Sequence, residues 1–221
     1  MASSPSSPGP STPNGTAANG KTELRALALA RRAALSTEAR ARASEAAARN
    51  AMAWLDGRWL DGRGRGTVAL FAPIGEEIDT TPLADLLRGA GARLALPVVT
   101  GRERPLLFRE WRADEPLVAS AGPGRSPIPA PPDHAAEVEP DVLVVPLAAF
   151  DARGHRLGYG AGFYDRTLAL LRASKRVEAI GYAFAVQELP ALPDEPHDEP
   201  LDAIATDAGL IRPCDPRPAE D

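Results

Sequence analysis

The stretch "RLGYGAGFYDR", residues Arg156–Arg166, places glycine at three alternate positions before two aromatic residues and an Asp-Arg pair. Glycine is used where the backbone must turn tightly or approach a ligand, and it is unfavourable inside a helix or a strand. We therefore interpret residues 158–162, with Gly158, Gly160 and Gly162, as a loop and call it the glycine loop.

The flanking residues indicate what this loop connects. Residues 141–146, "DVLVVP", form a short apolar β-branched run that suits a buried strand, and residues 163–176 have leucines at helical spacing. A strand, a glycine-rich loop and a helix are the usual setting of an anion cradle, in which backbone N–H groups face a phosphate. The G-x-G-x-G spacing matches neither the dinucleotide fingerprint nor a Walker loop, so an ordinary tight loop stays open as the alternative.

The composition predicts one globular domain. The chain has 221 residues, 44% of them hydrophobic, which is enough to fill a core. A net charge of -5 argues against a general nucleic-acid binder, and no apolar run is long enough to span a membrane. The single cysteine, Cys214, excludes an intrachain disulfide and a thiolate metal cluster, and fits a reducing cytoplasm.

The two ends of the chain differ from its middle. Residues 1–20 carry no charged side chain and are rich in Ser, Pro, Gly and Asn, so we expect a disordered N-terminal tail without a signal peptide. Residues 213–221 have a similar composition and predict a flexible C-terminal tail. The folded domain is therefore expected at residues 21–212.

The order of elements predicts an α/β fold. Two Ala- and Arg-rich helices, at residues 21–35 and 37–55, come first, and Ser36 can cap the second. Strands then alternate with a helix at 78–92, with Thr81 as its cap, and with the helix that follows the glycine loop. This alternation indicates a layered, mainly parallel sheet with its site at the carboxyl ends of the strands. The strands are expected at residues 67–73, 93–99, 106–111, 141–146, 177–184 and 201–206.

Polar residues gather just after these strands. Any one of them could be a solvated loop charge, but together with the glycine loop they suggest a nucleotide and metal site. Asp165 is the most specific, because a carboxylate in the first turn after a phosphate loop can hold Mg²⁺. A carboxylate stabilised by the helix dipole is its alternative. The other residues are Glu76, Glu77, Asp151, Arg153, Gln187, His197 and Asp198.

Residues 145–166, "VPLAAFDARGHRLGYGAGFYDR", closely resemble the signature of the 5-formyltetrahydrofolate cyclo-ligase family, also called methenyltetrahydrofolate synthetases. Segments 21–25, 71–83, 94–99 and 181–206 resemble other parts of that family, in order and at plausible spacing. The resemblance implies a single-domain, three-layer Rossmann-like α/β fold with a mainly parallel sheet, flanking helices and an N-terminal helical pair.

The resemblance also implies the reaction. ATP, with Mg²⁺, would phosphorylate the formyl oxygen of 5-formyltetrahydrofolate, and the neighbouring folate amine would then displace phosphate. The products are 5,10-methenyltetrahydrofolate, ADP and phosphate. Phosphorylation is needed because an amide-like oxygen is a poor leaving group. The implied enzyme is a cytoplasmic monomer whose folate can carry a polyglutamate tail, with no nucleic-acid or membrane partner.

The family's functional residues carry over to matching positions. Lys21 and Arg25 resemble its phosphate-contacting pair, although without the family they would be interpreted as a solvated helix face. Glu77 resembles the folate-binding carboxylate, and Asp165 and Asp198 resemble the Mg²⁺ ligands. The implied ATP loop comprises Arg156, Leu157, Gly158, Tyr159, Gly160, Ala161, Gly162, Phe163 and Tyr164.

Several of these residues are expected to do more than bind ATP. Residues 159–163 (Tyr159, Gly160, Ala161, Gly162 and Phe163) would also border the folate. The residues implied as catalytic are Lys21, Arg156, Tyr164 and Asp165. Tyr164 could equally be a core aromatic residue, and Gln187 receives no role.

Two positions depart from the family pattern. Ala130 stands where many relatives have Glu, and Ala161 where they often have Gly or Lys. The Ala130 departure leaves open a paralogue on the same scaffold that binds nucleotide but has altered or lost folate chemistry. An unrelated α/β nucleotide-binding module, or a folate-responsive regulatory protein, would have to match five segments by accident.

Overall fold

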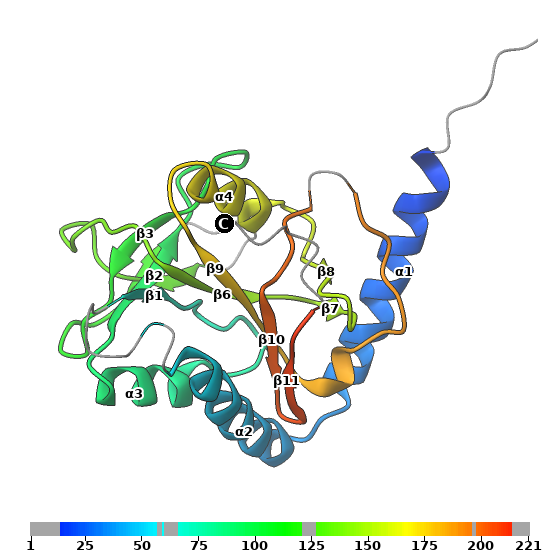
Figure 1. The fold of residues 1–221 in the computed structure, drawn as a ribbon, viewed down its shortest axis with the longest axis horizontal. Helices are drawn as coiled ribbons and strands as arrows, with labels where there is room; N and C mark the ends of the chain where they lie inside the picture. The colour runs from blue at the N-terminus through cyan, green and yellow to red at the C-terminus, as the bar shows by residue number, and fades with distance from the viewer. Residues whose placement is uncertain (1–13, 57–58, 60–65, 121–126, 196–197, 214–221) are drawn as a thin grey trace, which may run out of the picture.

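The computed structural model describes residues 14–56, 59, 66–120, 127–195 and 198–213, and its centre is a seven-stranded sheet (Figure 1). The strand order is β11-β10-β9-β6-β1-β2-β3. The inner pairs are all parallel, while β3 and β11 pair antiparallel at the two edges. The strands are β1 (Thr67–Ala69), β2 (Arg93–Val98), β3 (Leu107–Glu110), β6 (Val142–Pro146), β9 (Glu178–Tyr182), β10 (Ala203–Thr206) and β11 (Gly209–Ile211).

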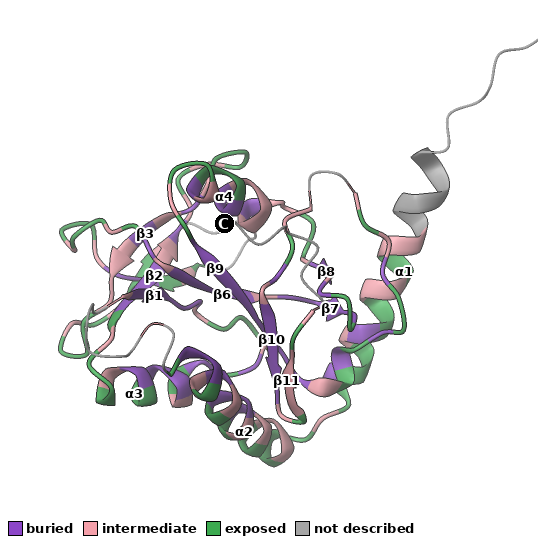
Figure 2. Ribbon diagram, in the orientation of Figure 1, coloured by how far each residue is buried: buried purple, intermediate pink, exposed green. Residues whose placement is uncertain are grey.

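The inner strands are buried on both faces, which explains their nearly continuous apolar sequences (Figure 2). In β6, Val142 and Val144 belong to one core cluster, whereas Leu143 and Val145 belong to the other. This alternation follows from the two-residue period of a strand, and helices cover each face. The mainly parallel, three-layer arrangement predicted from the sequence is confirmed.

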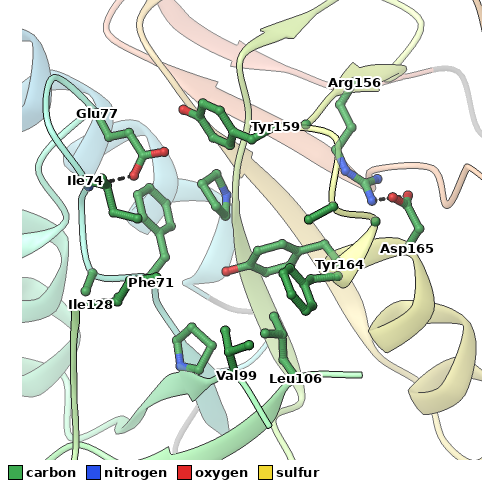
Figure 3. A pocket seen from close by; sticks show the side chains of 17 residues that line it. Phe71, Ile74, Glu77, Val99, Leu106, Ile128, Arg156, Tyr159, Tyr164 and Asp165 are labelled. Carbon is green, nitrogen blue, oxygen red and sulfur yellow. Dashed lines mark hydrogen bonds and ion pairs between the residues drawn. The ribbon is translucent and has the colours of Figure 1, made fainter. Parts of the chain in front are cut away.

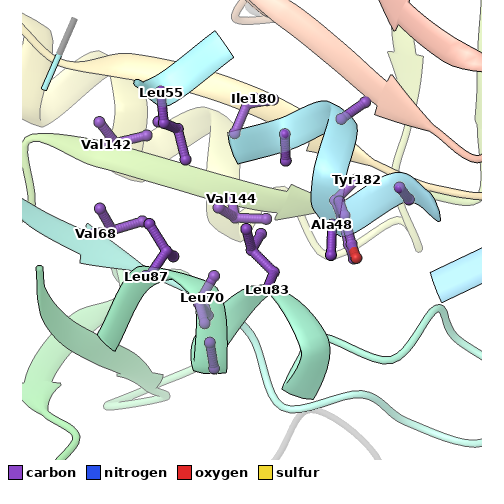
Figure 4. Packing of buried hydrophobic residues seen from close by; sticks show 14 of the residues in the cluster. Ala48, Leu55, Val68, Leu70, Leu83, Leu87, Val142, Val144, Ile180 and Tyr182 are labelled. Atoms are coloured by element: carbon purple, nitrogen blue, oxygen red, sulfur yellow. The ribbon is translucent and has the colours of Figure 1, made fainter. Parts of the chain in front are cut away.

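Helices α2 (Thr37–Leu55) and α3 (Thr81–Gly89) cover one face of the sheet (Figures 1 and 4). The prediction of Ser36 as the cap of α2 is confirmed, because its side chain accepts a hydrogen bond from Ala39 N at 3.2 Å. The prediction of Thr81 as the cap of α3 is wrong. Thr81 lies inside the helix, and its N–H donates to Asp79 Oδ1 at 2.9 Å.

Helix α4 (Phe163–Arg172) covers the opposite face, where Leu168 and Leu171 pack into the second cluster. It begins directly after the glycine loop, as predicted. Its buried side chains fix the direction in which its N-terminus points, and therefore the position of the loop.

Helix α1 (Asn14–Ala33) packs away from the main sheet (Figure 1). Ala28 and Leu24 contact a small cluster that includes Leu157 and Leu189. The two predicted N-terminal helices are thus both present, but they lie against different parts of the domain. Helix α1 begins at Asn14, before the expected boundary at residue 21, so residues 14–20 of the expected tail are helical. Residues 1–13 and 214–221 lie outside the described residues.

Several short elements were not predicted. The β7–β8 hairpin leads into the glycine loop, and β4 pairs with β5 in a second two-stranded sheet. Each has only two or three residues, too few to show a period. They are β4 (Val118–Ser120), β5 (Ile128–Ala130), β7 (Ala149–Phe150), β8 (Arg156–Leu157) and the 3-10 helix η1 (Ala185–Gln187).

Leu83→Ala should lower the free energy of unfolding by about 3 kcal/mol, because it leaves a cavity in the fully buried contact between α3 and the sheet. The matched control is Leu86→Ala in the same helix, where the side chain is 41% exposed. That change should cost less than about 1 kcal/mol. Urea denaturation of both variants measures the difference, and equal losses would contradict this packing.

Candidate functional site

A cavity of about 150 Å³ lies where β1, β2 and β6 end, at the carboxyl edge of the sheet predicted to hold the site. Figure 3 shows Tyr159 and Tyr164 extending into it from one side and Phe71 and Glu77 from the other. Its walls are mostly apolar, with a few polar groups at the rim, which is typical of a small-molecule site. The other lining residues are Ala72, Ile74, Pro97, Val99, Leu106, Ile128, Pro146, Arg156, Gly158, Ala161, Gly162, Phe163 and Asp165.

The glycine loop leaves open space beside its backbone. A Cβ added at Gly158 or Gly160 would meet no atom within 4 Å, and Gly160 has a φ of +94°. Gly162 has a φ of +63° and occupies the N-cap of α4. The first N–H groups of a helix have no partner within that helix, so the start of α4 offers donors beside this open space.

Helix α1 presents two cations to the same region. Arg25 Nε donates to the carbonyl oxygen of Gly158 at 2.8 Å, which ties the helix to the glycine loop. Lys21 Nζ lies 3.2 Å from Asp198 Oδ2 and 3.3 Å from Glu195 Oε1. Of the pair predicted from the family pattern, Arg25 therefore contacts the glycine loop, and Lys21 contacts the segment that holds Asp198.

The buried Arg156 and the partly exposed Asp165 form an ion pair across the base of the loop (Figure 3). Arg156 Nη2 lies 2.5 Å from Asp165 Oδ1, and Arg156 Nη1 donates to the carbonyl of Glu199. Burial lowers the pKa of Arg156, while the negative charges of Asp165 and Asp198 raise it and only partly offset the effect of burial. Asp165 also accepts from Glu199 N at 3.2 Å, so both predicted metal ligands lie beside the same segment.

Glu77 stands on the other side of the cavity, on the loop between β1 and α3. Its Oε2 accepts from Ile74 N at 2.8 Å, and Tyr159 lines the same cavity. Burial raises the pKa of Glu77, although Tyr159, Ile74 N and Arg32 counteract that rise. The acidic side chain and the glycine loop thus meet at Tyr159.

Phe163 and Tyr164 begin α4 and line the cavity, and both also contact the second core cluster. The two alternatives for Tyr164, site and core, are therefore not exclusive. Burial raises the pKa of its hydroxyl, which stays protonated at neutral pH. Leu157, expected in the ATP loop, is buried against α1 and does not line the cavity.

Asp151 and Gln187 hold backbone segments near the site. The Asp151 carboxylate accepts from Leu192 N at 2.9 Å and pairs with Arg153 Nη2 at 2.7 Å. Burial would raise the pKa of Asp151, but these donors hold it below its usual value. The Gln187 amide donates to the carbonyls of Leu147 and Ala148 at 2.9 and 3.0 Å. Neither residue lines the cavity, and Glu76 lies outside it near Arg40, at 3.8 Å.

Three of the contributors that were missed hold or shape the glycine loop side and the wall of the cavity. Arg32 donates to the Tyr159 hydroxyl, Ile128 forms part of the cavity wall, and Arg166 contacts the glycine loop. A signal existed for Arg32, which follows Lys21 and Arg25 at helical spacing. Arg166 belongs to the quoted motif, but nothing in the sequence shows that its side chain turns back to the Ala161 carbonyl.

The family pattern also implies a Mg²⁺ ion, and two carboxylates suit it. Mg²⁺ is usually held by one or two carboxylates, with water and substrate phosphates completing its shell. Asp165, which lines the cavity, and Asp198, which contacts Lys21, provide hard oxygen donors. Within the described residues, no cluster of three or more acidic, His or Cys side chains forms a protein-only metal cage.

The family model for 5-formyltetrahydrofolate cyclo-ligases matches residues 17–207. The chain belongs to this family. It is 41% identical over 145 residues to the 5-formyltetrahydrofolate cyclo-ligase of Escherichia coli K12, covering 63% of this chain and 77% of that protein. It is 38% identical over 146 residues to the cyclo-ligase of Mycolicibacterium smegmatis, covering 63% and 73% of the two chains.

Solved cyclo-ligase structures share the fold. The NMR structure of Aquifex aeolicus 5,10-methenyltetrahydrofolate synthetase superposes with a TM-score of 0.70 at 31% identity, over 91% of this chain and 96% of that one. The Mycoplasma pneumoniae 5,10-methenyltetrahydrofolate synthetase superposes with a TM-score of 0.65 at 25% identity, over 85% of this chain and 98% of that one. In the described part of this chain, no helix is long and apolar enough to cross a bilayer.

Of the two departures from the family pattern, Ala130 is buried at the end of β5, while Ile128 of the same strand lines the cavity. Ala161 lies in the loop, where its carbonyl accepts from Arg166 Nη2 at 2.7 Å. The part of the cavity wall that β5 contributes is therefore apolar, because it is formed by Ile128.

Gly162→Ala should lower the free energy of unfolding by about 2 kcal/mol, from left-handed strain and from lost Arg166 hydrogen bonds. Its added Cβ would lie 2.8 Å from Arg166 Nη1, displacing the guanidinium that binds Ala161. Gly91→Ala is the control: its φ is +79°, but the added Cβ meets no atom within 4 Å. The control should lose only about 1 kcal/mol. Chemical denaturation compares them, and the extra loss should vanish when Arg166 is replaced by Met.

Proposed function

We propose that this cyclo-ligase family member converts 5-formyltetrahydrofolate and ATP into 5,10-methenyltetrahydrofolate, ADP and phosphate. The observation that carries the proposal is the pairing of two unlike sites across Tyr159. On one side lies a glycine loop with cations from α1, and on the other an apolar cavity that contains Glu77. The first suits a polyphosphate and the second suits a flat ring with polar edges.

In the proposed arrangement, the ATP phosphates lie over Gly158 and Gly160, where the backbone is open. Lys21 and Arg25 supply positive charge from α1, and the N-terminus of α4 supplies N–H donors. Lys21 would exchange part of its contact with Asp198 and Glu195 for phosphate oxygens. Such exchange suits lysine, whose ammonium is a compact charge on a flexible stem.

The folate ring would occupy the apolar cavity. Glu77 would accept hydrogen bonds from ring N–H groups, and Phe71, Tyr164 and Ile128 would cover its faces. The formyl group would then point toward the glycine loop, because Tyr159, Ala161 and Gly162 of that loop line the cavity. Bringing the formyl oxygen in line with the terminal phosphate is the main contribution that positioning can make to phosphoryl transfer.

Arg156 and Asp165 are proposed to organise the transfer. The buried guanidinium of Arg156 would face the charge that develops on the transferred phosphoryl group. Asp165 and Asp198 would hold Mg²⁺, which when bound neutralises phosphate charge. After transfer, the folate amine attacks the formyl carbon, the C–O bond to phosphate breaks, and the amine loses its proton.

The remaining predictions concern context. A polyglutamate tail on the folate, a monomeric state, a cytoplasmic location and the extent of the domain at residues 21–212 stay predictions. No specific observation favours a paralogue without folate chemistry, although the apolar cavity wall at Ile128, with buried Ala130 in the same strand, keeps it as the alternative outcome of the test below.

The test is growth of the methenyl absorbance band when the purified protein is mixed with 5-formyltetrahydrofolate, ATP and Mg²⁺. Asp165→Asn should reduce the rate at least about 100-fold, because it removes a proposed metal-binding charge and leaves Arg156 without its carboxylate. Asp133→Asn is the control, since that side chain is 99% exposed and pairs with Arg109 away from the cavity.

Wild-type protein without a growing band, yet with measurable ATP binding, would replace the cyclo-ligase proposal with the paralogue. A band that grows equally fast with Asp165→Asn would overturn the role of Asp165 alone.

A further inference from the structure

Arg32 lies on the same side of α1 as Arg25, two turns further along the helix, and its side chain turns into the protein. The residue is only 9% exposed. Its Nη1 donates to the Tyr159 hydroxyl at 2.7 Å, and its guanidinium lies 5.9 Å from the centre of the Tyr159 ring. Its Nε is buried and has no hydrogen-bond partner in the protein.

A buried guanidinium is costly unless a negative charge compensates it. The Tyr159 hydroxyl is neutral, because burial raises its pKa well above the usual value. The compensating charge is Glu77, which lines the same small pocket as Arg32 and Tyr159 and whose pKa the Arg32 charge lowers. Arg32, Tyr159 and Glu77 therefore form a chain from α1, through the glycine loop, to the loop after β1.

We propose that Arg32 is a positioning residue for the folate side of the site, which holds the Tyr159 hydroxyl so that Glu77 faces the cavity as a carboxylate. This inference rests on the proposed function, in which Glu77 accepts hydrogen bonds from the folate ring. Arg32 does not line the main cavity and acts through its two partners.

The other groups around Glu77 do not replace Arg32. Tyr164, from α4, and Tyr182, from β9, are neutral phenols whose pKa values burial raises. Glu76, the chain neighbour of Glu77, is directed to Arg40 of α2, at 3.8 Å. Arg32 is the cation whose charge lowers the pKa of Glu77, against the rise that burial causes.

The test compares Arg32→Met with Arg31→Met. Methionine keeps the length of the side chain and removes its charge. Arg31 is the adjacent residue on the exposed side of α1, where its guanidinium binds only the Glu188 carbonyl, at 3.0 Å, among the described contacts. The methenyl assay gives KM for folate, KM for ATP and kcat across pH, and thermal unfolding of each variant reports its stability.

Arg32→Met should raise KM for 5-formyltetrahydrofolate about tenfold and change KM for ATP less than about twofold. Without the cation, Glu77 should bind its proton at a higher pH, so the acid limb of kcat/KM for folate should move up by about one pH unit. Arg32→Lys should recover part of that shift because it restores the charge. Tyr159→Phe should raise KM for folate in the same direction.

Three outcomes separate the possibilities. Equal rises in both KM values with an unmoved acid limb would overturn the proposal and leave Arg32 with a structural role. Behaviour like that of Arg31→Met would also overturn it. Absence of turnover in the wild type would instead refute the proposed function, which the same assay detects before any variant is measured.

Discussion

The ion pair between Arg156 and Asp165 is the constraint on which the site depends. Its two residues stand at the two ends of the glycine loop, one in β8 and one in the first turn of α4. Because the Arg156 side chain is only 5% exposed, its charge requires a fixed partner. The pair therefore closes the loop at its base. The glycines between these two residues need not make that contact, so their N–H groups can face the open space. In the proposed site, Asp165 would serve both Arg156 and Mg²⁺.

The domain brings the parts of the site together from distant positions along the chain. Helix α1 lies against the glycine loop, although more than 130 residues separate Arg25 from Gly158. The loop after β1 brings Glu77 from another direction. Tyr159 is the residue at which these segments meet. Nucleotide and folate would therefore bind to neighbouring parts of one short loop. A phosphorylated intermediate formed there would be surrounded by protein groups on the side of α1 and on the side of β1.

Much of this arrangement could be predicted from the sequence. Long apolar runs predicted the inner strands, and the change from strand period to helix spacing around the three glycines predicted the loop and α4. The β7–β8 and β4–β5 pairs were missed because two or three residues carry no period. The start of α1 was missed because residues 14–20 contain two glycines and two asparagines, a composition typical of a disordered tail.

Side-chain direction was the part of the site that the sequence could not provide. Arg31 and Arg32 are adjacent and chemically identical, yet one faces outward and the other reaches Tyr159. Only the docking of α1 decides between them. Gln187 lies in a segment that resembles the family, but its side chain has a structural contact. Its amide donates hydrogen bonds to the backbone carbonyls of Leu147 and Ala148.

The central claim is that the glycine loop aligns ATP with the formyl oxygen of a folate in the adjacent cavity. The most direct measurement uses 5-formyltetrahydrofolate with an oxygen isotope label in its formyl group and follows the label by mass spectrometry. Direct phosphorylation of the formyl oxygen predicts that the label leaves in the inorganic phosphate, one labelled atom for each methenyltetrahydrofolate formed. Unlabelled phosphate, released together with ADP, would show that ATP is hydrolysed separately and would contradict the account.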